Sequence, residues 1–334
     1  MKSKVNNETG GKMSIVTDTI DWLLQGDPSI RWQVMRDLLK EPPEIYEKER
    51  AQVKAQGWGR RLLSRQDAGG TWAGGIYNPK WISTTYTLLL LRQLGLPQDN
   101  AQAQKGCTHF LLKGIYHDGG INLFRSIDYS ETCINGMILT LFSYFRFPDE
   151  RVHDVTGFLL KEQMPDGGWN CQRVHGATHA SFNTTISVLE GMFEYGASYP
   201  KQASTIKKAV RHAHEFLLVH HLYRSHRTGK VVNSTMTRMN FPPQWHYDFL
   251  RALDYLQSVG AEYDERMKDA IELLKSKQQP NGRWAAYRPW PARVFFELEK
   301  TGEDSRWNTL RALRVLKWWE ERKPFHPKLN GLYT

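Results

Sequence analysis

A repeated unit of apolar helix, glycine turn and second apolar helix limits the folds open to this chain more than any other feature. Its clearest copy occupies residues 163–184. There Gln163 follows an apolar helix end, the chain turns at 165–168, and Trp169 comes directly after the turn. Glycine adopts backbone conformations that other residues resist, so the turn predicts a sharp break between two helices. The second helix is expected to begin near Ser181.

The same unit recurs at a spacing of roughly 40–60 residues, which is typical of helical-hairpin repeats. The glutamine position of each turn is held by Gln25, Gln66, Ile115, Gln163, His221 and Gln278. Apolar residues between the turns follow helical spacing, and strand patterns are scarce. We therefore expect a single all-α domain at 18–322, after a disordered lead-in at 1–17 and before a C-terminal tail at 323–334.

Six hairpins must bury two apolar layers, and a closed ring does so efficiently. The expected fold is an (α/α)6 toroid, in which inner helices surround a central cavity and outer helices shield them. An open solenoid is the alternative for any helical repeat. Closure is favoured because no unit carries the polar outer face of a capping repeat.

Three of the turns share a more specific pattern of apolar pair, glutamine, glycine and tryptophan. The copies are Leu62…Gln66…Gly70-Thr71-Trp72, Leu159…Gln163…Gly167-Gly168-Trp169 and Leu274…Gln278…Gly282-Arg283-Trp284. This pattern resembles the QW motif of the squalene–hopene cyclase and protein prenyltransferase superfamily, over about residues 22–319. The resemblance implies a toroid, a structural role for the Gln and Trp residues, and an apolar, isoprenoid-like substrate. The chain lacks the Asp-X-Asp-Asp motif with which class II terpene cyclases protonate their substrates.

The amino-acid composition limits where the protein can be located and which kinds of partner it can bind. The net charge is +10 over 334 residues, which suits a soluble basic protein or one that attracts an anionic substrate or a membrane surface. Nucleic acid is not expected, because the chain has no binding motif and no basic helix stripe. The three cysteines fit a reducing compartment, and no apolar run reaches the ~20 residues that span a bilayer. We expect a cytoplasmic protein; peripheral membrane contact and the oligomeric state stay open.

The first residues of the second helices would meet at one end of a toroid cavity. These segments are 29–32, 83–86, 130–133, 181–184, 244–247 and 305–308, and serine recurs in them as an expected N-cap. Aromatic and polar residues on separate elements are typical of a binding site. The expected substrate-binding residues are Trp32, Tyr86, Phe182, Asn183, Trp245, Trp307, Asn308, Arg31 and Arg306. The alternative is that these polar groups pair with one another and close a plug.

Two carboxyl groups at this end are the candidate acids. Glu131 and Asp248 stand at helix starts, where the helix dipole favours the charged form and aromatic burial favours the protonated form. His246 lies two residues before Asp248 and would orient or reprotonate it. The alternative is that Arg31 and Arg306 neutralise both carboxylates as salt bridges.

A zinc site is the competing interpretation of the same region. Protein prenyltransferases hold zinc with Asp-X-Cys and a histidine, and Glu131-Thr132-Cys133 resembles that pattern. His179 would complete a set with Glu131 and Cys133, leaving a fourth position open. The alternative is a buried free cysteine and a surface histidine. The favoured interpretation requires no cofactor.

The function expected from these features is that of a terpene-cyclase-like enzyme, an isomerase that cyclises or isomerises an apolar isoprenoid by acid initiation. Its substrate would be apolar, with a diphosphate as a further option, because the long connection 223–243 is basic. Connections 223–243 and 281–304 are long enough to be lids. The alternatives are a zinc-dependent transferase or lyase, a carbohydrate-active toroid, and a non-catalytic lipid- or protein-binding toroid. A cavity lined by apolar side chains would favour an isoprenoid substrate, and a cavity rich in amides and carboxylates would favour a sugar substrate.

Overall fold

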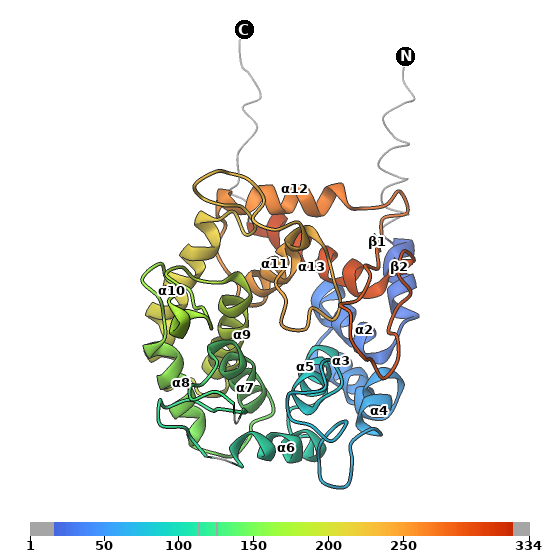
Figure 1. Ribbon diagram of the computed structural model, residues 1–334. Helices are drawn as coiled ribbons and strands as arrows, with labels where there is room; N and C mark the ends of the chain where they lie inside the picture. Colours follow the sequence, from blue (N-terminus) through green and yellow to red (C-terminus); the bar gives the residue numbers. More distant parts are fainter. Residues whose placement is uncertain (1–16, 113, 125, 323–334) are drawn as a thin grey trace, which may run out of the picture.

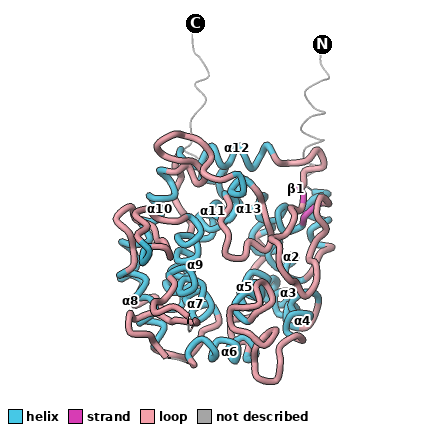
Figure 2. Tube along the Cα trace, in the orientation of Figure 1, coloured by secondary structure: helices cyan, strands magenta, loops and turns pink. Residues whose placement is uncertain are grey.

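The computed structural model describes residues 17–112, 114–124 and 126–322, and this part of the chain is mostly helical (Figures 1 and 2). The expected tail at 323–334, and all of the expected lead-in except residue 17, lie outside the described residues. Within the described part, no helix has both the length and the apolar character that crossing a membrane requires.

One set of helices lies toward the middle of the molecule (Figure 1). It comprises α2 (Pro28–Gln33) with its π-helical continuation η1 (Val34–Leu39), α5 (Thr84–Leu94), α7 (Thr132–Tyr144), α9 (Phe182–Ser198), α11 (Phe249–Ser258) and α13 (Arg306–Arg322). Helix α7 is buried along nearly its whole length, as expected of a helix that is apolar on every face.

A second set lies around the periphery (Figure 1). It comprises helical residues 17–24, α4 (Gly57–Leu63), α6 (Ala101–Thr108), α8 (Arg151–Lys161), α10 (Ala203–Val219) and α12 (Lys268–Ser276). These helices are amphipathic: α10 buries Ile206, Ala209 and Ala213 and exposes Lys207 and Lys208. The remaining elements are α3 (Pro43–Ala51), η2 (Gln52–Lys54), η3 (His109–Leu111), η4 (Arg173–His175), η5 (Ser234–Thr237), η6 (Glu265–Met267) and the antiparallel pair β1 (Trp284–Ala285) and β2 (Asp304–Ser305).

The inner helices contact one another in sequence around the middle of the molecule. Helix α5 contacts α7, α7 contacts α9, and α11 contacts α13, which in turn contacts α2 and η1. The Nε1 atom of Trp32 donates to the carbonyl of Leu94 at 2.9 Å and so joins α2 to α5. An ion pair between Arg251 and Glu190 joins α11 to α9. The first and last inner helices therefore lie side by side.

Two glycines allow α7 and α9 to pack closely. A Cβ atom on Gly136 would lie 2.8 Å from the backbone nitrogen of Val188, and one on Gly191 would lie 2.6 Å from the carbonyl oxygen of Gly136. Backbone atoms cannot move aside as a flexible side chain can, so larger residues would push the two helices apart.

The three Gln–Trp motifs form the same hydrogen bonds in each copy. Each tryptophan Nε1 donates to a leucine carbonyl ten residues earlier, at 2.7 to 2.9 Å, and the acceptors are Leu62, Leu159 and Leu274. Each glutamine Nε2 donates to the carbonyl of the glycine four residues later, and this glycine has a positive φ in all three copies. Gln163 also donates to the carbonyl of Ala209 in the next outer helix. The expected structural role of these residues is confirmed.

The expected serine caps are only partly present. The hydroxyl of Ser305 accepts a hydrogen bond from the backbone of Asn308, as an N-cap does. The cap of α2 is Asp27, and the cap of α11 is Asp248, so α11 begins after the expected start at 244–247. Ser83 occupies a cap position, but its hydroxyl donates to a loop carbonyl instead. The expectation of a shared serine cap was therefore wrong for most of these helices.

Candidate functional site

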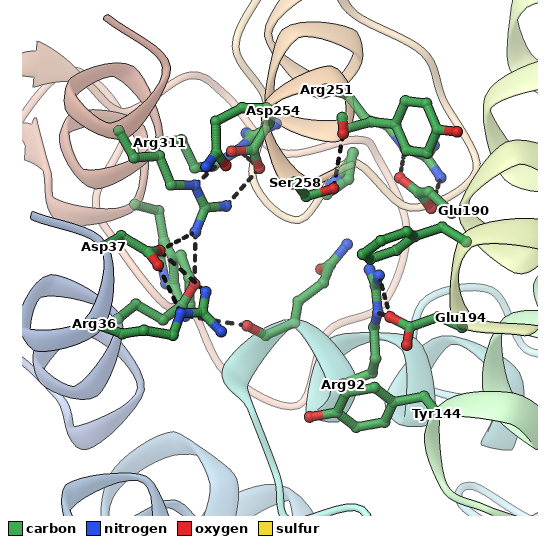
Figure 3. A pocket seen from close by; sticks show the side chains of 18 of the residues that line it. Arg36, Asp37, Arg92, Tyr144, Glu190, Glu194, Arg251, Asp254, Ser258 and Arg311 are labelled. Carbon is green, nitrogen blue, oxygen red and sulfur yellow. Dashed lines mark hydrogen bonds and ion pairs between the residues drawn. The ribbon is translucent and has the colours of Figure 1, made fainter. Parts of the chain in front are cut away.

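A pocket with a volume of about 470 Å³ lies in the middle of the inner helices. Every inner helix contributes to its wall, mostly through residues beyond the first turn (Figure 3). Its aromatic lining residues are Trp32, Tyr144, Phe193, Phe241, Tyr255 and Trp307. Its ionisable groups include six arginines and four carboxylates, an excess of two positive charges. We call this space the central pocket.

Two ion pairs join α9 to its neighbours across one side of the central pocket (Figure 3). Arg251 on α11 binds Glu190 through two hydrogen bonds of 2.8 and 2.9 Å. Arg92 on α5 binds Glu194, one helical turn further along α9, at 2.6 Å. Burial alone would raise the pKa of Glu190, but the guanidinium of Arg251 outweighs this effect and lowers the pKa. This carboxylate is therefore held in its ionised form.

A second charged cluster links α13, α11 and η1 on the other side. Arg314 binds Asp254 through two hydrogen bonds of 2.6 Å each, and it also reaches Asp37 at 3.2 Å. Arg311 binds the same Asp254 through its Nε atom at 3.2 Å. Burial opposes ionisation of both aspartates, but the neighbouring arginines lower the pKa of each. Glu190, Asp37 and Asp254 are therefore not suited to donate a proton.

Two residues that line the central pocket each have a side-chain donor with no hydrogen-bond partner among the described residues. The donors are Nη1 of Arg311 and Nε1 of Trp307, and both atoms are buried. The two residues are four positions apart on α13 and so share one face of the helix. An unpaired buried donor costs roughly 1–3 kcal/mol, and more when it is charged. A ligand with an oxygen acceptor at this place would remove that cost.

A second pocket of about 310 Å³ lies beneath the long connection at 281–304. Its wall is largely apolar and includes Leu62, Leu90, Trp290, Phe295 and Phe296. Its polar groups include Glu299 and Asn308, and burial raises the pKa of Glu299. We call this space the apolar pocket.

Phe241 lines both pockets and stacks on Trp307, with ring centres 4.1 Å apart and planes 16° apart. This residue belongs to the other long connection, 223–243, which therefore reaches into the middle of the molecule. The aromatic stack forms part of the wall between the two spaces.

The structure separates the expected substrate-binding residues. Trp32 and Trp307 line the central pocket, whereas Asn308 lines the apolar pocket. Arg31 lines neither pocket and pairs with Glu49 at 2.6 Å. Arg306 lies over the ring of Trp22 and donates to its carbonyl oxygen. Neither arginine neutralises the candidate acids.

The other expected aromatic residues fall into two groups. Tyr86 and Trp245 lie around the ammonium group of Lys80, which is also 4.3 Å from the ring centre of Tyr77 and donates to both tyrosine hydroxyls. Phe182 packs instead against three other rings. Asn183 accepts a hydrogen bond from the backbone of Tyr247, at the entry to α11.

The candidate acids line neither pocket. Asp248 is 3% exposed, caps α11 through the backbone N–H of Arg251, and has a pKa raised by burial to about 6. Burial also raises the pKa of Glu131, against the attraction of Lys80. His246 is stacked between two tryptophan rings, and burial lowers its pKa to about 4, so it is neutral at pH 7.

The expected zinc ligands do not form a cluster. Across residues 17–112, 114–124 and 126–322, no three His, Cys, Asp or Glu side chains are close enough together to hold a metal. His179 lies against Arg227 at 3.3 Å, and a cation is a poor neighbour for a zinc ligand. Cys133 is a free, partly exposed cysteine.

The arginines and carboxylates of the central pocket wall were not among the site residues expected from the sequence. Two patterns indicate them in retrospect: Arg251 and Asp254 in α11, and Arg311 and Arg314 in α13, each pair three residues apart next to buried apolar residues of its helix. Charges at such positions cannot reach solvent at the outer surface, and so they must face a partner or a cavity.

Comparison with known proteins gives structural similarity without a sequence match. No protein-family model matches the chain, and no curated protein matches it. A protein from Actinoplanes is similar in structure, with a TM-score of 0.47 and 16% identity over 92% of this chain and 99% of that chain. A variant of the type II terpene cyclase MstE from Scytonema, bound to its substrate geranylgeranyl dihydroxybenzoate, has a TM-score of 0.46 and 17% identity over 93% and 99%.

Proposed function

We propose that this chain is a cytoplasmic (α/α)6 toroid enzyme whose central pocket binds the oxyanion of a partly apolar small molecule. The observation that carries the proposal is the pair of unpartnered donors, Arg311 Nη1 and Trp307 Nε1, on one face of α13. A carboxylate, phosphate or diphosphate oxygen accepts from both types of donor.

The charge of the central pocket supports an anionic ligand. Each carboxylate of the wall is already bound to at least one arginine, and the arginines outnumber the carboxylates by two. A cationic ligand would have to compete with those arginines for the same oxygens. An anion instead accepts hydrogen bonds that the wall leaves unused.

The neighbouring apolar pocket supports a substrate with an apolar body. Phe241 stacks on Trp307 between the two spaces, so a molecule whose anionic end lies in the central pocket would reach Leu62, Leu90 and Phe295 by displacing this stack. Burial of such a chain is favourable by about 25 cal/mol per Å². An isoprenoid diphosphate combines both chemical features, and this is the substrate class that we favour.

Calorimetric titration with matched ligands tests the proposal. The ligands are inorganic diphosphate, farnesyl diphosphate and the uncharged alcohol farnesol. We expect both anions to bind, farnesyl diphosphate more tightly, and farnesol to bind more weakly than either. Binding of the anions should weaken as salt is added, because screening reduces the attraction. Tighter binding of farnesol than of both anions would contradict the proposed site.

A second candidate is acid-initiated cyclisation or isomerisation of an isoprenoid. Its support is the chemistry of Asp248, a buried carboxyl group whose raised pKa keeps part of it protonated near neutral pH. Glu131 is the alternative acid, and neutral His246 would be the group that returns the proton. Under this mechanism, turnover falls as the pH rises above about 6. A double variant that carries Asp248→Asn and Glu131→Gln should have no turnover of an identified substrate. Full activity of each single variant would exclude the mechanism.

A further inference from the structure

The four carboxylates of the central pocket are all bound by arginines, and this determines how the pocket can hold a diphosphate. Glu190 pairs with Arg251 at 2.8 Å, and the side chain of this arginine is only 5% exposed. Glu194 pairs with Arg92 at 2.6 Å (Figure 3). In each pair one cation already compensates the charge of one anion, so neither carboxylate has a free charge to offer a metal ion.

Three arginines surround the other two carboxylates of the wall. Arg314 bridges Asp254 and Asp37, with nitrogen–oxygen distances of 2.6 and 3.2 Å. Arg36 also binds Asp37, at 2.6 Å. Arg311 also binds Asp254, at 3.2 Å, and its buried Nη1 has no partner among the described residues. We call these three arginines the arginine cluster; it carries one positive charge more than its two carboxylates balance.

Many proteins hold diphosphates through Mg²⁺, and the donors of the central pocket do not fit this ion. Mg²⁺ is bound by one or two carboxylates together with phosphate oxygens, in near-octahedral geometry. Each carboxylate here would first have to give up an arginine, which for Glu190 would leave Arg251 as a buried, unpaired charge. A guanidinium needs no metal, because its forked N–H groups bind two phosphate oxygens directly.

We propose that the arginine cluster takes the place of a divalent cation, so that the central pocket selects a free diphosphate group over its magnesium complex. This selectivity rests on the proposed oxyanion site and specifies the form of ligand that the site takes. Mg²⁺ neutralises part of the charge of the diphosphate, so the complex gains less from the excess positive charge of the cluster. Mg²⁺ also covers oxygens that the arginine donors would otherwise bind.

Calorimetric titration of the full chain with inorganic diphosphate, in EDTA and then in MgCl₂, tests this selectivity. Sodium chloride keeps the ionic strength of the two buffers equal, so that screening does not differ between them. We expect the apparent affinity to fall in MgCl₂, in proportion to the fraction of diphosphate that the ion sequesters. Sulfate is the control ligand, because Mg²⁺ binds it far more weakly, and its affinity should be nearly the same in both buffers.

The two results that would contradict the expectation have different consequences. Equal or tighter binding of diphosphate in MgCl₂ would overturn the selectivity and leave the oxyanion site on α13 intact. No binding of diphosphate in either buffer would overturn the oxyanion site, and the selectivity with it.

Asp37→Asn should change diphosphate binding in opposite directions under the two modes of recognition. The variant keeps the size of the side chain and removes a negative charge beside the arginine cluster. Arg314 keeps its bond to Asp254, and the side chain of Arg36 is 41% exposed, so neither is left buried and unpaired. We therefore expect tighter binding of diphosphate in EDTA than in the native chain. A loss of affinity confined to MgCl₂ would identify Asp37 as a metal ligand and overturn the inference.

Discussion

Replacement of Trp169 by phenylalanine should destabilise the protein through one identifiable hydrogen bond. The indole nitrogen donates at 2.7 Å to the carbonyl of Leu159, in the last turn of α8. Such a carbonyl has no partner within its own helix, so the substitution leaves it buried and unpaired. The expected cost is about 1–3 kcal/mol for the unpaired carbonyl. A further ~1–2 kcal/mol is expected for the smaller ring in a close-packed site.

Trp318 offers a matched control on α13. It is 6% exposed, and its indole nitrogen has no hydrogen-bond partner among the described residues. Trp318→Phe therefore removes the same atoms without breaking a hydrogen bond. Urea denaturation followed by circular dichroism should show a free energy of unfolding lower in Trp169→Phe than in Trp318→Phe by about 1–3 kcal/mol. Equal losses in the two variants would refute the assigned role of the tryptophan motif.

Three further changes test other parts of the structure. Glu190→Gln should lower the free energy of unfolding, measured by urea denaturation, by about 3–5 kcal/mol, because it leaves Arg251 as a buried unpaired charge. Replacing Glu190 by leucine and Arg251 by methionine together should recover most of this loss. The imidazole of His246 should titrate near pH 4 by NMR; since the fold favours its neutral form, stability should fall as the pH drops from about 6.5 toward 4, and less so in His246→Phe. Asp27→Ala should lower the melting temperature, because it removes the cap of α2, whose loss costs about 0.5–2 kcal/mol, together with the hydrogen bond to the backbone of Trp58.

The repeat architecture was accessible from the sequence because its determinants are local. Gln163, Gly167 and Trp169 form their hydrogen bonds within a few residues of one turn, so a fixed spacing in sequence corresponds to a fixed geometry. The spacing recurs in the other copies of the motif, and the helices expected between the turns are present in the described part of the chain.

The candidate site was not accessible in the same way, because its position depends on how helices turn about their axes. Arg31 and Trp32 are adjacent in sequence, yet one pairs with Glu49 away from the pockets and the other lines the central pocket. Adjacent positions on a helix point about 100° apart. Alignment of the helix starts pointed to the wrong end of several inner helices, because Arg92, Tyr144 and Ser258 line the central pocket from the C-terminal ends of their helices. It also does not determine which residue faces inward. The partners of Arg251 and Arg311 come from other helices, and local patterns carry no information on them.

The central claim is that donors of α13 bind an oxyanion. The most direct test measures how tightly inorganic diphosphate binds to variants that each lack one of these donors. Arg311→Lys removes the forked guanidinium, Trp307→Phe removes the indole N–H, and Arg266→Lys changes an exposed ion pair elsewhere as a control. Calorimetric titration should show affinity reduced about 10-fold or more by each pocket variant, which corresponds to roughly 1.5–3 kcal/mol for a hydrogen bond to a charged group. Arg266→Lys should bind as the native chain does. Equal affinity in the native protein and both pocket variants would contradict the oxyanion site on α13.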